Sequence, residues 1–181
     1  VEDLGVEQVN FFVARGLSGN LPVLMQNAAS AGIFSNPAVD ASDGVYRRTA
    51  MLLTYQDQLY PALSLAMLNL YLDNPGIGLV IHPQSPNILD GIKVGQRIIP
   101  TDERGAMLVP YQGPAKTFRY VSALDVLQRR LEPSALDGAI VLVGTSAPGL
   151  QDLRSTPVGA TYPGVEVHAN LLAGMLNHYV S

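Results

Sequence analysis

Three side chains near the carboxyl end of the sequence could act together in hydrolysis. Ser146, Asp152 and His168 occur in the order nucleophile, acid, base that α/β-hydrolases use, just after a β-branched run. A nucleophile elbow, however, needs the pattern G-x-S-x-G so that the chain can reverse sharply beneath the serine. The sequence GTSAPG delays the second glycine and inserts a proline. A serine hydrolase is therefore kept only as an alternative function.

Glu166 and His168, together with Asp152, could also supply oxygen and nitrogen ligands to a metal ion. Residues two apart do not face each other on a helix, so this pair could share a metal only in an extended segment. The sequence has no H-x-x-x-H or H-E-x-x-H spacing. We therefore predict no metal site and no cofactor. Glu166 is expected in the first turn of a helix, and His168 is expected to be partly buried and hydrogen-bonded.

The loop after the β-branched run could instead bind a small anion. It would leave the carboxyl end of a buried strand, which is where open α/β sheets form their crevices. The candidate ligand-binding residues are Gly144, Thr145, Ser146 and Asp152. The alternative is that glycine and proline only turn the chain, with Asp152 and Thr156 tying the loop to its own backbone. Neither a Walker lysine nor a G-x-G-x-x-G motif is present, so a nucleotide is not indicated.

The elements that must position these residues alternate between helix and strand. Apolar spacing predicts helices over residues 21–31, 63–70, 123–131 and 165–180. Gly32 offers a left-handed stop after the first, and Ser122 offers a cap before the third. The second is so apolar that it is expected to pack in the core, and the last carries an apolar face.

Strand signals fill the intervals between the helices. A strand through Val45 and Leu53 leads into a tight turn at residues 56–58, and residues 74–87 predict a loop around a brief strand at 79–81. Apolar runs at 98–99 and 107–109 predict a hairpin with Gly105 left-handed in its turn. Residues 139–143 predict a central strand buried on both faces. The fold class is therefore α/β, with a mixed, partly parallel sheet and helices packed on it like a three-layer sandwich.

Composition narrows the classes of function. The 181 residues carry a net charge of −4 and only 11 Lys and Arg, so nucleic acid is not expected as a partner. With 48% hydrophobic and 14% charged residues, some apolar surface is expected to meet a partner. The absence of cysteine excludes disulfides and thiolate chemistry and suits an oxidising compartment. No run approaches the roughly 20 apolar residues of a membrane span, and neither an initiator methionine nor a signal peptide precedes Val1.

The carboxyl-terminal third carries a motif that resembles a known family. A buried strand, a glycine turn, a Gly-Leu-x-Asp step, a Thr-Pro and then Pro-Gly-Val-Glu-x-His-Ala-Asn follow one another through residues 140–170. The stretches 43–48, 61–65 and 111–114 and Gly105 also occur in the expected order. This pattern resembles the type-two CHASE domain, an extracellular sensory module of bacterial receptors. The resemblance covers nearly the whole chain, although a further strand and helix region that family members place before it is not found.

The resemblance implies a single, non-enzymatic sensor domain over residues 1–181, corresponding to the carboxyl-terminal part of the family pattern. It implies a place outside the cytoplasmic membrane in an inner-membrane receptor, between transmembrane helices, with a cytoplasmic output module such as an adenylate or guanylate cyclase, a diguanylate cyclase, a histidine kinase or a serine/threonine kinase. The last predicted helix would run on towards the membrane. The signal would be an unidentified small molecule or a physical stimulus, and the intact receptor would be a homodimer. A purely structural dimerisation module is the remaining alternative.

Within this interpretation, the polar residues near the last helix hold a signalling joint together. Pro163 and Gly164 would set the angle at which the helix leaves the sheet, and Glu166, His168 and Asn170 would lock that angle to the strand-end loop. Thr156 and Pro157 belong to the same motif. We expect loss of the His168 side chain to destabilise the domain or to mute signalling, with no hydrolytic activity to lose.

Overall fold

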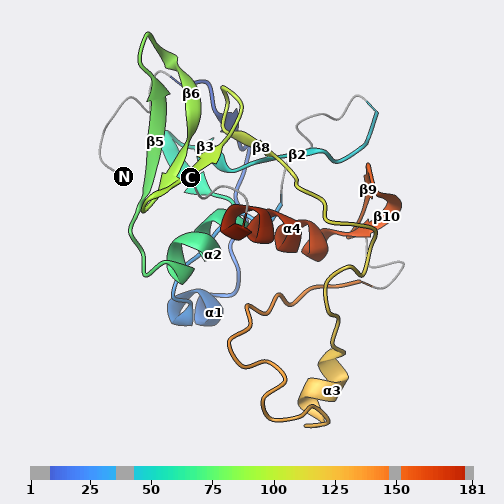
Figure 1. Cartoon of the computed structure of the whole chain (residues 1–181). Helices are drawn as coiled ribbons and strands as arrows, with labels where there is room; N and C mark the ends of the chain where they lie inside the picture. Colours follow the sequence, from blue (N-terminus) through green and yellow to red (C-terminus); the bar gives the residue numbers. More distant parts are fainter. Residues whose placement is uncertain (1–8, 36–42, 147–151, 178–181) are drawn as a thin grey trace.

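The structure is a computed structural model that describes residues 9–35, 43–146 and 152–177. Helices and short strands are mixed along the described chain (Figure 1). The helices are α1 (Pro22–Asn27), α2 (Leu63–Tyr71), α3 (Ala123–Leu127) and α4 (Gly164–Asn177). The strands are β1 (Phe12–Val13), β2 (Arg48–Ala50), β3 (Leu52–Tyr55), β4 (Gln58–Pro61), β5 (Ile77–His82), β6 (Ser85–Val94), β7 (Arg97–Pro100), β8 (Ala106–Leu108), β9 (Leu153–Thr156) and β10 (Gly159–Pro163).

The described strands form four small sheets. One has the order β1-β3-β4, with β1 parallel to β3, and another is the antiparallel β5-β6-β7. The pairs β2-β8 and β9-β10 are also antiparallel. The predicted α/β class with a partly parallel sheet is confirmed. The three-layer sandwich is not confirmed.

The tight turn predicted at residues 56–58 is confirmed. Gln56 and Asp57 have φ angles of 49° and 61°, and they join β3 to β4 in an antiparallel hairpin. Both central residues have positive φ, which is the backbone twist that two-residue hairpins favour. Local turn chemistry was enough to place this hairpin.

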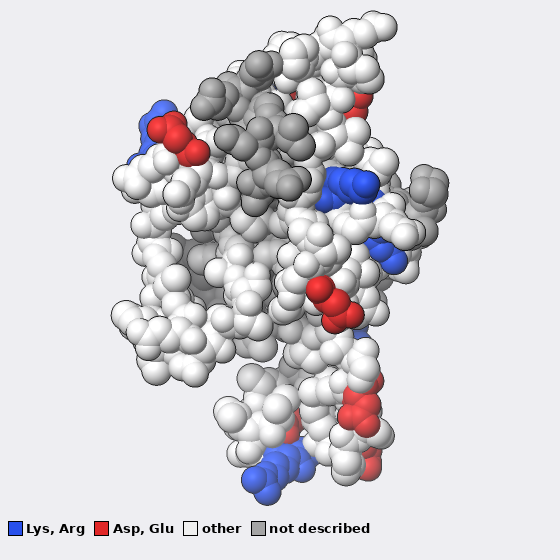
Figure 2. Space-filling model, turned by 90° about the vertical axis from the view of Figure 1, so that its left-hand side faces the viewer, with Lys and Arg blue, Asp and Glu red and all other residues white. Residues whose placement is uncertain are grey.

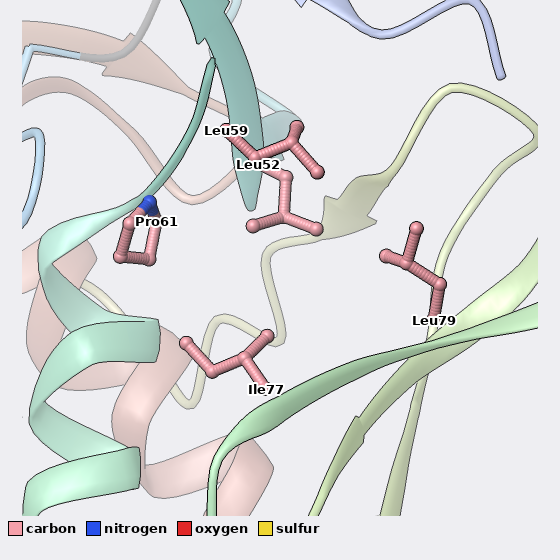
Figure 3. A pocket seen from close by; sticks show the side chains of 5 residues that line it. All are labelled: Leu52, Leu59, Pro61, Ile77 and Leu79. Atoms are coloured by element: carbon pink, nitrogen blue, oxygen red, sulfur yellow. The ribbon is translucent and has the colours of Figure 1, made fainter. Parts of the chain in front are cut away.

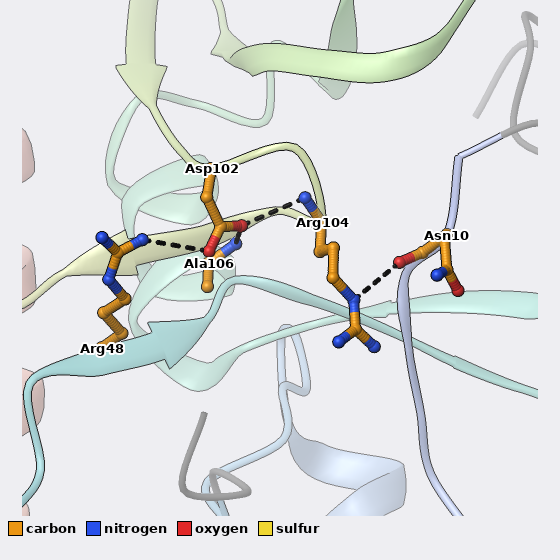
Figure 4. Close-up of polar contacts among 5 residues, drawn as sticks. All are labelled: Asn10, Arg48, Asp102, Arg104 and Ala106. Atoms are coloured by element: carbon orange, nitrogen blue, oxygen red, sulfur yellow. Dashed lines mark hydrogen bonds and ion pairs between the residues drawn. The ribbon is translucent and has the colours of Figure 1, made fainter. Parts of the chain in front are cut away.

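The strands on either side of residues 101–105 do not form the predicted hairpin. Gly105 has the expected left-handed φ of 81°, but β7 pairs with β6 and β8 pairs with β2. Asp102 explains the change of direction, because its Oδ1 accepts the amides of Arg104 at 3.1 Å and Ala106 at 2.8 Å (Figure 4). Its Oδ2 accepts from Arg48 at 3.1 Å. The side chain thus closes the turn and fixes it to β2.

Strand β6 was not predicted from the sequence at its full length. Its first residues fall in the expected loop 74–87, yet they pair with β5, and the last residues pair with both β5 and β7. Pro86, Asp90 and Gly91 interrupt the local strand signal. Antiparallel pairing with adjacent segments of the chain outweighs these weak propensities.

Residues 139–143 do not form the predicted central strand. They belong to no strand, and Ile140, Val141 and Val143 are 39%, 52% and 91% exposed. A β-branched run favours an extended backbone, but a strand also needs a neighbour to receive its hydrogen bonds. No described segment pairs with this run.

Helices α1 and α3 are shorter than predicted, and neither has a buried residue. Helix α1 ends at Asn27 with Ala28 extended, well before Gly32, and none of its residues is buried. Helix α3 begins at the predicted cap, where Ser122 Oγ accepts from the Leu124 amide at 3.3 Å. It ends at Leu127, and Arg129 has a φ of 54°. Without a covering surface, the apolar spacing alone does not extend either helix.

Helices α2 and α4 form the centre of the molecule and lie against each other (Figure 1). Leu65 and Leu68 of α2 and Leu171 and Met175 of α4 are completely buried in one core cluster with strand residues such as Ile92. The prediction that α2 lies in the core is confirmed, and α4 lies in the core as well. Helix α4 begins one residue earlier than predicted, and residues 178–180 of the predicted helix lie outside the described residues.

Candidate functional site

The corner between β10 and α4 is held by Asp152. Pro163 ends β10 and Gly164 begins α4. The Gly164 amide donates to the Asp152 carbonyl at 2.8 Å. A Cβ at Gly164 would lie within 2.2 Å of Asp152 Oδ1. Only glycine therefore lets the carboxylate lie over the helix start without a shift. Thr156 Oγ1 donates to the Gly159 carbonyl at 3.0 Å and closes the turn through Pro157.

The strand-end loop also touches the start of α4. A Cβ at Gly144 would lie 2.6 Å from the Cβ of Val165, so the two backbones approach closely. The candidate ligand residues Thr145 and Ser146 are exposed, and residues 147–151 lie outside the described residues. Of the predicted ligand set, Gly144 and Asp152 therefore meet at the first turn of α4, where they pack against the helix.

Two pockets in the described part of the chain lie away from this loop. One is a small apolar pocket between β3, β4 and β5, lined by Leu52, Leu59, Pro61, Ile77 and Leu79 (Figure 3). The other is an open groove beside Asp102, lined by Arg48, Pro100, Thr101, Asp102, Ala106 and Leu108. Neither contains a residue of the candidate set.

Glu166 is a buried carboxylate, only 2% exposed. Its Oε2 accepts from the Lys116 amide at 2.9 Å and the Tyr120 hydroxyl at 2.8 Å, and Oε1 accepts from the Phe118 amide at 3.3 Å. Burying a carboxylate is tolerated only when hydrogen bonds replace water. Burial raises the pKa of Tyr120, and the hydrogen bond to Glu166 raises it further, so Tyr120 stays a donor at neutral pH.

Asn170 lies one helical turn after Glu166 and is completely buried. Its Oδ1 accepts from the Gln112 amide at 2.9 Å. Its Nδ2 donates to the Tyr162 hydroxyl and to the Glu166 carbonyl, both at 2.8 Å. Both amide hydrogens and the amide oxygen are thus used, which fixes the orientation of the side chain.

A third contact continues this row along α4. A Cβ at Gly174 would lie 2.3 Å from the Pro110 Cγ, so the helix and residue 110 are in close contact. Glu166, Asn170 and Gly174 are four residues apart and share one helix face. They meet residues 116–120, then 112, then 110. Residues 110–120, which we call the strap, therefore run antiparallel to α4 along that face.

His168 faces a different segment. Its Nε2 lies 3.3 Å from the Phe34 carbonyl, which can only accept, so Nε2 carries the proton. Nδ1 is buried and has no partner among the described residues. Burial lowers the pKa of His168, opposed by the Phe34 carbonyl and the Asp152 charge. Neither ring nitrogen bonds Ser146 in the described structure, so the triad order in the sequence is not matched by a nucleophile-base contact.

Arg97 holds the other end of α4. Its Nη1 donates to the carbonyls of Met175 at 3.3 Å and Leu176 at 2.9 Å. A cation at a helix carboxyl end satisfies orphan carbonyls and complements the helix dipole. Because Arg97 begins β7, this contact fixes α4 to the β5-β6-β7 sheet.

Sequence reasoning selected the α4 side chains but not their partners. We expected Glu166, His168 and Asn170 to bind the strand-end loop, whereas their hydrogen bonds reach the strap, Phe34 and Tyr162. The strap binds through backbone amides, which leave no signature in the residue types. The one available signal was the stretch 111–114, part of the resemblance. No residue pattern indicated Arg97.

The described residues hold no candidate metal cluster and no candidate membrane helix. Within residues 9–35, 43–146 and 152–177, no cluster of three or more His, Asp or Glu could hold a metal ion. In the same part of the chain, no helix is long and apolar enough to cross a membrane.

The fold and the site define a mixed α/β domain in which buried polar side chains hold one helix against three separate segments. The chain belongs to the CHASE2 family, because the CHASE2 domain profile matches residues 7–181, essentially the whole chain. CHASE2 domains are extracytoplasmic sensory modules of receptors, and the family is sensory, not catalytic. The resemblance inferred from the motifs is therefore confirmed. No curated protein and no solved structure matches the chain.

Proposed function

We propose that this domain senses a signal outside the cytoplasm and passes it through α4 to a cytoplasmic output module of the same receptor. The output is an adenylate or guanylate cyclase or a sensor kinase, reached through flanking transmembrane helices of an inner-membrane protein. The observation that carries the proposal is the way α4 is held. Its amino-terminal half is bonded to the strap and its last carbonyls to Arg97.

The signal would act by shifting the population between two packings of α4. A small molecule or physical stimulus can shift this equilibrium only by its differential interaction with the two states. The strap and the β6–β7 hairpin are the input elements, because each bonds α4 directly. A displacement of either element changes which carbonyls, amides and carboxylates of the helix are satisfied.

The polar contacts suit a two-state element better than a graded one. Leaving a buried carboxylate or amide unpaired costs on the order of 1–3 kcal/mol for each group. The helix therefore either keeps its polar contacts with the strap or replaces them as a set. Intermediate positions would leave Glu166 and Asn170 buried without partners.

A disulfide between α4 and the strap tests the proposal. A Cβ at Gly174 would lie 3.3 Å from the Pro110 Cβ, close to the separation of about 3.5–4.5 Å in disulfides. The chain has no cysteine of its own, so Pro110→Cys with Gly174→Cys gives one defined bridge. We expect oxidation of this double variant in the intact receptor to fix cyclase or kinase output at one level and reduction to release it.

Each single-cysteine variant, treated in the same way, is the control for effects of the substitutions and of the oxidant. Peptide mapping shows whether the bridge has formed. A receptor whose output range is the same with the bridge formed and reduced would exclude α4 motion along the strap as the signal.

A further inference from the structure

The segment between the strap and the strand-end loop projects from the body of the molecule. We call residues 121–143 the α3 arm; it contains α3 and then the run 139–143 (Figure 1). Its apolar side chains are exposed, most of all Leu127 at 81% and Val143 at 91%. Monomeric proteins do not usually expose apolar residues in such concentration.

The run 139–143 has the residue types of a strand, but it pairs with no described strand. Alanine, isoleucine, valine, leucine and valine follow one another, yet residues 140–143 make no backbone hydrogen bond to another described segment. An exposed, apolar segment with unused amides and carbonyls is a template for another chain to pair with. The surface that fits it is a second extended segment.

The run matches itself. In an antiparallel pair centred on Val141, Val141 faces its own copy, Ile140 faces Leu142, and Ala139 faces Val143. All are aliphatic cross-strand pairs of the stabilising kind. Residues 138–146 contain no charge, so two copies meet without repulsion, whereas a charged strand would find no counter-charge there. The self-match is the reason to favour a second copy over another occupant.

The exposed area is sufficient for such a contact. Six large apolar side chains of the arm are at least 39% exposed, and at roughly 50–100 Å² each they expose about 300–600 Å². The run itself supplies three of these side chains, so a dimer contact has to include α3 as well to approach the roughly 800 Å² that each partner gives to a standard interface. The six residues are Leu124, Val126, Leu127, Ile140, Val141 and Val143. Figure 2 shows acidic and basic side chains together on the projecting lower lobe, so they can form a polar rim of mixed sign.

We propose that the run 139–143 pairs antiparallel with the same run of a second copy and so forms a twofold dimer. The arrangement is isologous: Ala139 contacts the partner's Val143, and Val143 contacts the partner's Ala139. It does not depend on the sensory role. It does place the dimer axis beside α4, because both ends of the arm are fixed to the first turn of that helix. Before the arm, Tyr120 donates a hydrogen bond to Glu166, and after it, Gly144 packs on Val165.

Single cysteines test the register, since the chain has none and any disulfide must join two copies. Val141→Cys places two thiols directly opposite, about 4.5–5.5 Å apart between Cα atoms, within disulfide reach. Ala139→Cys in the same run puts its two copies about 13 Å apart, too far to bridge. We expect Val141→Cys to oxidise to a covalent dimer, while Ala139→Cys and the 73% exposed Val13→Cys remain largely monomeric on denaturing gels.

Sedimentation of unmodified protein gives the second test. The full chain is expected to show a saturable monomer–dimer equilibrium, and Val143→Glu to weaken it roughly tenfold or more because a charge enters an apolar contact. Val13→Glu, an equally polar change at another exposed valine, should leave it unchanged. Because both valines are exposed, neither variant is expected to unfold the chain.

Several outcomes would overturn the proposal. These are a chain that stays monomeric at all concentrations, open-ended assembly, or equal effects of Val13→Glu and Val143→Glu. Slow amide exchange of residues 140–143 in a monomer would show that the run pairs within its own chain. Binding of the monomer to phospholipid vesicles that is lost in Val143→Glu would identify a membrane surface as the occupant instead.

Discussion

Helix α4 and the α3 arm distribute polar and apolar residues in opposite ways. Helix α4 buries a glutamate, a histidine and an asparagine, and the arm exposes leucine, isoleucine and valine. Globular proteins normally show the reverse at both places. The buried polar groups of α4 are tolerated because they bond specific partners, and they hold the helix in one register. The exposed apolar groups of the arm have no such partner within the described chain.

Two contacts connect the α3 arm to α4. Tyr120, just before the arm, donates to Glu166, and Gly144, just after it, packs on Val165. A force on the arm therefore reaches the first turn of α4 without passing through the rest of the core. The comparison predicts that substitutions in α4 affect folding strongly and that substitutions in the arm mainly affect association.

Removal of the Glu166 side chain should have the largest effect. Glu166→Ala leaves two amides of the strap and the Tyr120 hydroxyl without their acceptor in a site that is 2% exposed. We expect a loss of about 3 kcal/mol in the free energy of unfolding, measured by urea denaturation. Glu132→Ala, the same substitution at an exposed position of the arm, should change it by less than about 0.5 kcal/mol. Similar losses in both variants would contradict the division between the two regions.

Adding a methyl group at Gly144, next to the start of α4, should have an intermediate effect on the free energy of unfolding. In Gly144→Ala the added Cβ would fall 2.6 Å from the Cβ of Val165, which is attached to the helix backbone and cannot rotate away. We expect a loss of about 2 kcal/mol from overpacking. Gly16→Ala is the matched control because its Cβ would enter open space. If thermal unfolding finds the two variants equally stable, the arm is not rooted on α4 as described.

The His168 effect should be smaller and should depend on pH. His168→Ala is expected to lose about 1–2 kcal/mol at pH 7, because the bond to Phe34 and buried ring contacts disappear. Burial lowers the pKa of His168, so the folded state resists protonation. The stability from this group is full above the unfolded pKa of about 6.5 and is lost as pH falls through the folded value.

The difference between wild type and His168→Ala should therefore narrow on acidification. Urea denaturation at several pH values measures it, with His82→Ala as a control at a half-buried histidine of β5. A difference that widens at acidic pH would mean that the folded state prefers the charged imidazole.

Features that depend on neighbouring residues were predictable from the sequence. The turn at residues 56–58, the Ser122 cap and the long helix α4 all follow from local spacing and side-chain chemistry. The burial of Glu166 and Asn170 was not predicted, but the motif that contains them marked the correct helix. In each case the information lies within a few residues of the feature.

Features that depend on a distant partner were not predictable. The run 139–143 has a stronger strand signal than β6, yet β6 pairs on both sides and the run does not. Likewise, β7 and β8 have the pattern of a hairpin but bind β6 and β2. Strand propensity measures fit to a half-buried surface, and the sequence does not state where that surface is.

The antiparallel course of the strap along α4 limits how the helix can move. Its contacts lie at Glu166, Asn170 and Gly174, in a row on one face of the helix that is inclined to the helix axis. Rotation by one residue, about 100°, would remove all three at once. A tilt about Gly164 acts as a lever instead: Gly174, about 15 Å along the axis, moves furthest and separates first. The long Arg97 side chain can follow a small displacement of the helix end. Helix α4 can therefore tilt more easily than it can rotate about its own axis.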